Sequence, residues 1–352
     1  MHYSTDLGLH PLYQSIKKKK DEEAIDFSPV REEHILLSAP SSSAIQKIGC
    51  LILAGGQGTR LGKGPKGLVE LPLKEKKTLF ELLFNKIKKK GDNLSIAIMT
   101  SPLNHHETVN YLKKENWFGV NPSYIDIFQQ DMLPLCDETG HLFFEAQGVI
   151  AQAPSGNGKA LFYLCERGIT LKWEKRGVEY VQVIPIDNPL ALPFDGEFLY
   201  LHEKKGVDLV LRSIRRKDAE EKVGLLGMQN GHLTVKEYSE LNEAVKRDVE
   251  QYYLANTGLF SCSIHFIKKV FTSNTILPWH MAKKKGRKII QTKDGWESLE
   301  IWTWKFELFI FDLFPFANSF QIILTDREKC FAPLKNHVGP DSIETVAKVI
   351  ST

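Results

Sequence analysis

An apolar run that leads into a basic, glycine-rich loop constrains this chain more than any other feature. The run is residues 51–54, and the loop that follows, residues 55–67, carries Arg60, Lys63 and Lys66 among its glycines. Glycines let backbone N–H groups come close to a phosphate, and the cations supply the positive charge that such a site needs. A mobile surface turn is the alternative. The combination of glycines and cations directly after a strand favours a phosphate-binding loop.

The spacing within the loop excludes two common phosphate-binding motifs. In a Walker A motif Ser or Thr would follow Gly62-Lys63, but Gly64 stands there, and Gln57 occupies the position of the first glycine. The dinucleotide fingerprint also fails, because Gly62 comes one residue late after Gly56 and Gly58. A P-loop NTPase and an NAD enzyme are therefore both disfavoured.

The loop resembles the signature of the sugar-nucleotide pyrophosphorylases. Residues 53–62, followed by Pro65-Lys66-Gly67, are most similar to the eukaryotic-type UDP-N-acetylhexosamine pyrophosphorylases. The related UDP-glucose pyrophosphorylases usually have asparagine at the position of Ala54 and lack the arginine of Arg60. The resemblance implies nucleotide binding by Leu53, Ala54, Gly55 and Gly56, and catalytic roles for Arg60 and Lys66, which would stabilise the leaving pyrophosphate.

Composition is that of a globular protein rather than a nucleic-acid-binding one. The 352 residues are 42% hydrophobic, and 46 Lys and Arg against 43 Asp and Glu leave a net charge of only +3. The lysine runs read as solvated faces. A chain of this length favours one catalytic domain with smaller appendages. We expect no nucleic-acid partner, and the sequence leaves the oligomeric state open.

The cysteines and the apolar segments favour a cytoplasmic protein. The five cysteines are scattered without a CxxC spacing, so neither a disulfide framework nor a zinc site is predicted. The first residues lack the apolar core of a signal peptide. The most apolar stretch, residues 308–324, contains Asp312, Pro315 and Asn318, which argues against a membrane span.

Short apolar runs alternate with longer amphipathic ones, a pattern typical of an α/β domain with a largely parallel sheet. Strands are predicted at 51–54, 95–100, 124–129, 180–185 and 208–213. Helices are predicted at 79–89, 107–115 and 160–172, and a hairpin around Asn230-Gly231. The resemblance specifies this fold as that of the nucleotide-diphospho-sugar transferases, which is Rossmann-like and GT-A-like with a mixed sheet.

Three regions follow from this pattern and from the resemblance. Residues 1–45 are predicted to be a helical lead-in that ends in a serine-rich linker, and residues 46–330 the catalytic nucleotidyltransferase domain. Residues 331–352 are expected to be a short C-terminal segment, with most of the C-terminal domain usual in these pyrophosphorylases absent.

Two segments are candidates for binding the base. Gln130 ends a predicted strand and suits a base edge, because an amide both donates and accepts; a strand-end polar cap is the alternative. Gly156 and Asn157 lie in a loop that opens a helix, although Gly-Asn-Gly is also ordinary turn chemistry. The resemblance implies that Gln130, Gly156 and Asn157 bind uracil. Asp131 and Lys159 stand where the resembled proteins have glycine.

Asp187 is the candidate metal ligand. It directly follows a strong apolar strand, where a carboxylate facing a phosphate site is suited to Mg²⁺, while an N-cap or turn aspartate is the alternative. The resemblance matches Asp187-Asn188 to the pair whose aspartate holds the metal, and implies Mg²⁺ as cofactor.

The sugar side rests on the resemblance, which implies sugar contacts for Gly224, Glu237, Asn256, Phe309 and Phe311. Core packing is the alternative for the aromatic segment 306–316. Leu259 replaces an asparagine that helps to hold the sugar in the acetylhexosamine enzymes. Lys335 matches a lysine that reaches the phosphates.

The function predicted in this way is a uridylyltransferase that makes a UDP-sugar and pyrophosphate from UTP and a hexose 1-phosphate, with N-acetylglucosamine 1-phosphate as the first candidate. Two alternatives remain: a UTP–glucose-1-phosphate uridylyltransferase, favoured by Leu259, and a non-catalytic UTP or UDP-sugar sensor, favoured by Asp131, Lys159 and Leu259.

Overall fold

A ten-stranded sheet forms the centre of the computed structural model, which describes residues 7–19, 27–58, 61, 64–293 and 295–351. Its main path runs in the order β1 (Ile35–Leu36), β19 (Phe320–Leu324), β13 (Leu209–Arg215), β16 (Leu254–Ser263), β12 (Tyr180–Pro185), β2 (Ile48–Leu53), β5 (Ile96–Thr100) and β6 (Ile125–Gln129). Only β16 is antiparallel to its neighbours on this path. The prediction of a mixed, largely parallel sheet is thus confirmed.

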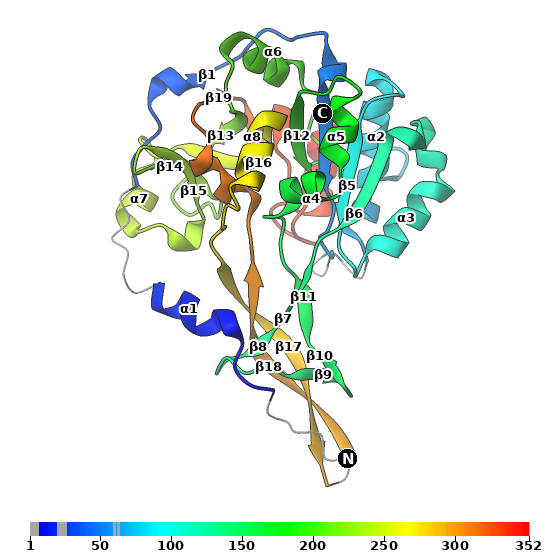
Figure 1. Cartoon of the computed structure of the whole chain (residues 1–352), viewed down its shortest axis with the longest axis vertical. Helices are drawn as coiled ribbons and strands as arrows, with labels where there is room; N and C mark the ends of the chain where they lie inside the picture. The colour runs from blue at the N-terminus through cyan, green and yellow to red at the C-terminus, as the bar shows by residue number, and fades with distance from the viewer. Residues whose placement is uncertain (1–6, 20–26, 59–60, 62–63, 294, 352) are drawn as a thin grey trace.

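Helices cover both faces of this sheet (Figure 1). One apolar cluster joins the sheet to α4 (Ala160–Glu166), α5 (Ile169–Glu174) and α8 (Ile264–Thr272), and the other joins it to α2 (Leu79–Lys90), α3 (His105–Lys114) and α10 (Ile343–Ser351). Leu51 faces the first cluster, whereas Cys50 and Ile52 face the second, because successive side chains of a strand point to opposite faces. Burial on both faces explains why these strands read as continuous apolar runs.

Most of the predicted elements are present within a few residues of their expected bounds. The one predicted helix at 160–172 is instead two, α4 and α5, because Gly168 adopts a left-handed conformation with φ 68° between them. The predicted hairpin consists of β14 (Leu225–Gln229) and β15 (His232–Lys236). Asn230 and Gly231 have φ 51° and 79°, as a two-residue turn with positive φ at both positions requires.

The described part of the predicted lead-in, residues 1–45, is only partly helical. It contains α1 (Pro11–Lys19) and the 3₁₀ turn η1 (Glu32–His34), but Ile35–Leu36 forms β1 and adds an edge strand to the central sheet. The predicted serine-rich linker lies against α6 (Gly196–Lys205), where the Ser42 amide donates to the Gly196 carbonyl at 2.9 Å. A two-residue strand carries no periodicity, so the sequence alone did not indicate it.

A long hairpin extends away from the body of the molecule (Figure 1). Its strands, β17 (His280–Thr292) and β18 (Gly295–Glu307), pair in register over their whole length, and β8 (Cys136–Asp137) adds a third strand. This arm was not predicted, because the lysine run 283–285 inside β17 reads as a solvated face. His280 begins the arm, and Glu307, which pairs with it, ends the arm.

The remaining elements are short. They are β3 (Glu70–Leu71), β4 (Lys77–Thr78), β7 (Met132–Pro134), β9 (Phe144–Ala146), β10 (Val149–Ile150), β11 (Gln152–Pro154), α7 (Glu243–Arg247), α9 (Arg327–Cys330), η2 (Ile45–Lys47), η3 (Lys66–Leu68), η4 (Asn116–Gly119), η5 (Pro122–Tyr124), η6 (Tyr238–Glu240) and η7 (Ile310–Phe316). All five cysteines are free thiols, as predicted. Within the described residues, no helix combines the length and the apolarity that crossing a membrane requires.

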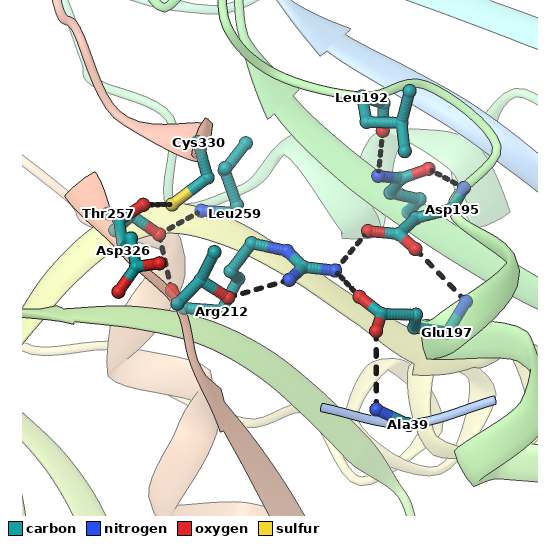
Figure 2. Close-up of polar contacts among 11 residues, drawn as sticks. Ala39, Leu192, Asp195, Glu197, Arg212, Thr257, Leu259, Asp326 and Cys330 are labelled. Atoms are coloured by element: carbon teal, nitrogen blue, oxygen red, sulfur yellow. Dashed lines mark hydrogen bonds and ion pairs between the residues drawn. The ribbon is translucent and has the colours of Figure 1, made fainter. Parts of the chain in front are cut away.

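A buried arginine joins α6 to the sheet (Figure 2). Arg212 on β13 is 8% exposed and lies between the carboxylates of Asp195 and Glu197, with N–O distances of 2.5 and 2.7 Å. Its other terminal nitrogen donates to the Thr325 hydroxyl at 2.7 Å. Asp195 in turn caps the first turn of α6 through the Glu197 amide. The cluster fixes this helix against the sheet edge that carries β13 and β19.

Candidate functional site

The predicted nucleotide site lies at the carboxyl ends of four adjacent parallel strands, β12, β2, β5 and β6. Gly55 follows β2, Gln130 follows β6 and Asp187 follows β12. Ligands of open parallel sheets bind at this edge, because the loops there point out of the sheet together. Three segments that are far apart in the sequence are therefore neighbours in the fold.

The glycine-rich loop is held closed by backbone bonds and by one side chain that the sequence did not single out. The Lys66 amide donates to the Gly56 carbonyl at 3.2 Å, and the Gly58 amide to the Gly64 carbonyl at 3.0 Å. Asn104, which is 1% exposed and follows β5, donates from Nδ2 to the carbonyls of Ala54 and Gly56 at 2.9 and 3.2 Å. Asn104 thus fixes the start of the loop.

The predicted catalytic lysine and the predicted metal ligand are in direct contact. Lys66 Nζ lies 2.8 Å from Asp187 Oδ2, and the two side chains are 20% and 24% exposed. The ammonium group of Lys66 and the carboxylate of Asp187 therefore lie side by side, half-buried, at the sheet edge. Arg60, predicted to act with Lys66, lies outside the described residues.

The segment that carries Lys335 is anchored on the same dipeptide. The Leu334 amide donates to the Asp187 carbonyl at 2.8 Å. Asn188 holds this segment by its side chain, donating to the Cys330 carbonyl at 2.7 Å and accepting from the Ala332 amide at 3.1 Å. Lys335 follows directly. Asp187 and Asn188 therefore hold the C-terminal segment next to the glycine-rich loop. Lys335 lies 148 residues after Asp187 in the sequence.

On the base side, Gln130 packs against Gly55. A Cβ built on Gly55 would lie 2.0 Å from Gln130 Nε2, so this position has room only for glycine while the amide keeps its place. Gln130 is 5% exposed, and within the described residues its Oε1 is buried without a hydrogen-bond partner. A buried acceptor without a partner is costly unless a ligand satisfies it. This is the feature expected of a base-reading amide.

The second segment that is predicted to bind the base packs against the root of the arm. Gly156 has φ 89°, and a Cβ there would lie 2.4 Å from the Leu308 carbonyl oxygen. Asn157 uses its Oδ1 to accept from the Ile310 amide at 3.0 Å, so its side chain positions η7. Asp131 and Lys159, the two departures from glycine, form an ion pair with 3.1 Å between Oδ2 and Nζ.

The predicted sugar residues also lie together. A Cβ on Gly224 would lie 3.2 Å from Glu237 Oε1, and the Gly224 carbonyl accepts from the Asn256 amide at 2.8 Å. Burial, followed by the Glu240 carboxylate, raises the pKa of Glu237, while the charges of His280 and Lys335 lower it. The charge of Lys335, predicted to reach the phosphates, therefore acts on Glu237, predicted to bind the sugar.

Phe309 and Phe311, the two predicted sugar-binding aromatics, stack with ring centroids 5.1 Å apart, and His280 lies against Phe309 at 4.5 Å.

Leu259, in contrast, is 4% exposed and belongs to the apolar cluster around β2 and α2. Figure 2 shows its amide beside Thr257, whose hydroxyl accepts from Leu259 at 3.2 Å and donates to the Arg212 carbonyl. Position 259 is thus a core position of β16 in this chain.

The donor set fits a magnesium ion that arrives with a nucleotide. Among the described residues, no group of three or more His, Cys, Asp or Glu side chains is placed to hold a metal by itself. Mg²⁺ is commonly bound through one or two carboxylates together with substrate phosphates. Asp187, half-buried beside the glycine-rich loop, meets that requirement, and its carboxylate is paired with the ammonium group of Lys66.

Sequence comparison assigns the chain to a family. The sequence model of the UDPGP family, described as UTP–glucose-1-phosphate uridylyltransferase, matches residues 11–336. The chain belongs to this family. It is 32% identical over 314 residues to the UDP-N-acetylglucosamine pyrophosphorylase of Saccharomyces cerevisiae, a match that covers 84% of this chain and 65% of the yeast protein. The chain thus spans slightly less than two thirds of that relative's length.

Solved structures of UDP-sugar pyrophosphorylases have the same fold. A structure from Entamoeba histolytica superposes with a TM-score of 0.78 at 26% identity and covers 91% of this chain and 86% of its own. The UDP-N-acetylglucosamine pyrophosphorylase of Trypanosoma brucei, solved with an inhibitor, has a TM-score of 0.74 at 28% identity, covering 87% and 66%. The predicted fold of the nucleotide-diphospho-sugar transferases is confirmed.

Proposed function

We propose that this protein is a uridylyltransferase that makes a UDP-sugar and pyrophosphate from UTP and N-acetylglucosamine 1-phosphate. The observation that carries the proposal is the contact between Lys66 and Asp187 at the mouth of the glycine-rich loop, 2.8 Å apart. Membership of the UDPGP family and the name of the yeast relative support it.

In the proposed reaction, a phosphate oxygen of the sugar 1-phosphate attacks the α-phosphorus of UTP. A new P–O bond forms, the bond between the α-phosphorus and its bridging oxygen breaks, and pyrophosphate leaves with the electron pair. Such a transfer needs positioning and charge neutralisation more than covalent help from the protein. Gly55 and Gly56 present backbone N–H groups to the phosphates, and Lys66 neutralises the charge that develops on the leaving group.

Lys335, held next to Asp187 by the Leu334 amide, is suited to bind the phosphate of the sugar substrate. Gln130 offers its buried Oε1 to a donor of the base, and N3–H of uracil is such a donor. Asp187 would hold Mg²⁺ bound to the nucleotide. Bound Mg²⁺ supplies charge neutralisation and orientation of the phosphate oxygens.

For the identity of the sugar substrate, one observation favours a specific alternative. Leu259 stands where the acetylhexosamine enzymes have an asparagine, and here it is a core residue. This observation favours glucose 1-phosphate as the alternative substrate, with UDP-glucose as product. A UTP sensor without turnover is a further alternative from a different class.

A substrate panel tests these possibilities. The protein is incubated with UTP, Mg²⁺ and N-acetylglucosamine 1-phosphate, glucose 1-phosphate or galactose 1-phosphate, and pyrophosphate is measured. We expect the largest kcat/KM with N-acetylglucosamine 1-phosphate. Faster release with glucose 1-phosphate would support the competitor. UTP binding without release from any sugar phosphate would contradict the enzyme proposal and support the sensor.

We also propose that the protein acts in the cytoplasm. Its five thiols are all unpaired, which is typical of a reducing compartment. The test is microscopy of the tagged full-length protein; a signal confined to another compartment would contradict the proposal.

A further inference from the structure

His280 lies between two carboxylates at the root of the arm. Its Nδ1 is 3.2 Å from Glu240 Oε1, and its Nε2 is 2.9 Å from Asp312 Oδ2. The imidazole is 19% exposed, so water has limited access to these contacts. The sequence had not singled out His280, because nothing in the run that follows it indicates a partner.

This geometry requires a protonated ring. A neutral imidazole donates from one nitrogen only, and its other nitrogen would then direct a lone pair at a carboxylate oxygen. The imidazolium donates from both nitrogens and satisfies both carboxylates. Although burial disfavours the charge, the hydrogen bonds to Asp312 and Glu240 outweigh it and raise the pKa of His280 to about 9.

Each carboxylate positions a different part of the sugar side. The second oxygen of Glu240 accepts from the Glu237 amide at 3.0 Å and so fixes the residue predicted to bind sugar hydroxyls. Asp312 accepts from the Phe309 amide at 3.4 Å, and the His280 ring itself packs on Phe309. His280 thus connects the Glu237 turn to the aromatic stack, two segments about 70 residues apart in the chain.

None of the other charged groups named here for His280 is a cation that lies between Glu240 and Asp312. These groups come from several segments of the chain. They are Lys236 at the end of β15, Glu237 between β15 and η6, Glu240 at the end of η6, Asp312 on η7, Glu307 on β18, and Lys335 on the C-terminal segment, which acts on Glu237. Glu307, opposite His280 in the arm, is paired with Lys305 at 2.7 Å. Without the imidazolium, Glu240 and Asp312 would lose the cation that lies between them.

We propose that His280, as an imidazolium, is a positioning residue that sets the sugar-binding side of the site by holding the Glu237 turn and the Phe309–Phe311 stack in a fixed relation. The proposal rests on the proposed uridylyltransferase function. The contacts of His280 are with Glu240, Asp312 and Phe309, none of which is a predicted phosphate or base residue. Its loss should therefore change the binding of the sugar 1-phosphate and leave the binding of UTP nearly unchanged.

The first experiment compares His280→Gln with wild-type protein and with the matched control His34→Gln. His34 is also half-buried, stacks on an aromatic ring (Phe320, 4.3 Å) and faces a carboxylate, but it directly precedes β1, which forms the edge of the central sheet. We expect His280→Gln to raise the KM for the sugar 1-phosphate by about tenfold, with the KM for UTP within about twofold of wild type. His34→Gln should leave both KM values near wild type.

The second experiment follows the pH. The KM of the wild-type protein for the sugar 1-phosphate should rise as the pH is raised from 7 to 9.5, because His280 loses its proton, while His280→Gln should show a flatter profile. Asp312→Asn removes one of the two carboxylates that favour the imidazolium, so the rise should begin at a lower pH. A residue that only filled space would not move this profile.

The outcomes separate the two proposals. If wild-type protein releases no pyrophosphate, the proposed function fails. If wild-type protein is active, then an unchanged sugar KM in His280→Gln, an equal rise in both KM values, or a pH profile that Asp312→Asn does not shift would overturn the role of His280.

Discussion

Asp131 and Lys159, 28 residues apart in the sequence, form an ion pair across the two segments that are predicted to bind the base, with 3.1 Å between Oδ2 and Nζ. Each of them replaces a glycine of the resembled proteins, and both are among the features that favour the alternative of a non-catalytic sensor. In the ion pair, the negative charge of Asp131 is neutralised by the positive charge of Lys159. The Ser155 amide, which donates to the Asp131 carbonyl at 2.9 Å, adds a backbone bond to the same connection.

This pair should make a small, coupled contribution to nucleotide binding. Its side chains are 48% and 42% exposed, and exposed pairs are worth about 1 kcal/mol or less, which is about fivefold in affinity. Asp131→Ala and Lys159→Ala should each raise the KM for UTP by up to about fivefold, and the exchange Asp131→Lys with Lys159→Asp should restore part of it. Strictly additive single and double variants would contradict the coupling.

Lys66 and Asp187 should both be indispensable for activity. Removal of a group that neutralises charge in the transition state costs about 100-fold to 1,000-fold in kcat. Lys66→Ala and Asp187→Asn should therefore lose most turnover while their unfolding midpoints stay near that of wild type. The matched control is Lys268→Ala, which removes a 2.6 Å ion pair with Glu174 between α8 and α5. Residual activity above about a tenth of wild type in either site variant would oppose the assignment.

Gly55→Ala should impair UTP binding without unfolding the chain. The new Cβ would meet the amide end of Gln130 at 2.0 Å, and a side-chain end can move aside where backbone cannot. The expected result is a KM for UTP raised about tenfold by displacement of Gln130. Gly168→Ala is the control, because its surroundings are open within 4 Å and the cost there is limited to the positive φ. Equal KM values for Gly55→Ala and wild type would contradict the packing argument.

Arg212 should be a stability residue. Arg212→Met would leave the Asp195 and Glu197 carboxylates without their shared cation, and breaking a buried pair in this way costs about 3–5 kcal/mol. We expect the free energy of unfolding in urea to fall by about that amount, with the KM values of the folded protein little changed. A loss below about 1 kcal/mol would show that the carboxylates find other partners.

The stability of the protein should depend on pH through His280. Its pKa is raised from an ordinary 6.5 to about 9 in the folded state, so the folded protein binds the proton more tightly than the unfolded chain. The stabilisation is complete below pH 6.5 and is lost as the pH rises through about 9. The difference in unfolding free energy between wild type and His280→Gln should therefore shrink between pH 6.5 and 9.5. A constant difference would contradict the charged state.

Much of this site could be predicted from the sequence, because the strand and the loop that build it are specified by residues that are close together in the chain. The apolar run before Gly55 and the glycines after it specify a strand and a loop by their own conformational preferences, and their spacing excluded two other phosphate motifs. The alternation of strands and helices likewise predicted the parallel sheet. Once that sheet is parallel, Gly55, Gln130 and Asp187 must meet at one edge, because each follows the carboxyl end of its strand.

Other features depended on tertiary structure alone, because they are contacts between residues whose separation carries no pattern. Asp131 meets Lys159 only through the folding of the two base segments, and Asn104 meets the glycine-rich loop only because β5 lies beside β2. The protonated form of His280 is stabilised by two carboxylates on other elements. The sequence determined the class of the fold and the chemistry of its loops. The three-dimensional packing decided which polar groups became partners, since the energy of an ion pair or a buried hydrogen bond depends on distance and burial, which spacing along the chain does not give.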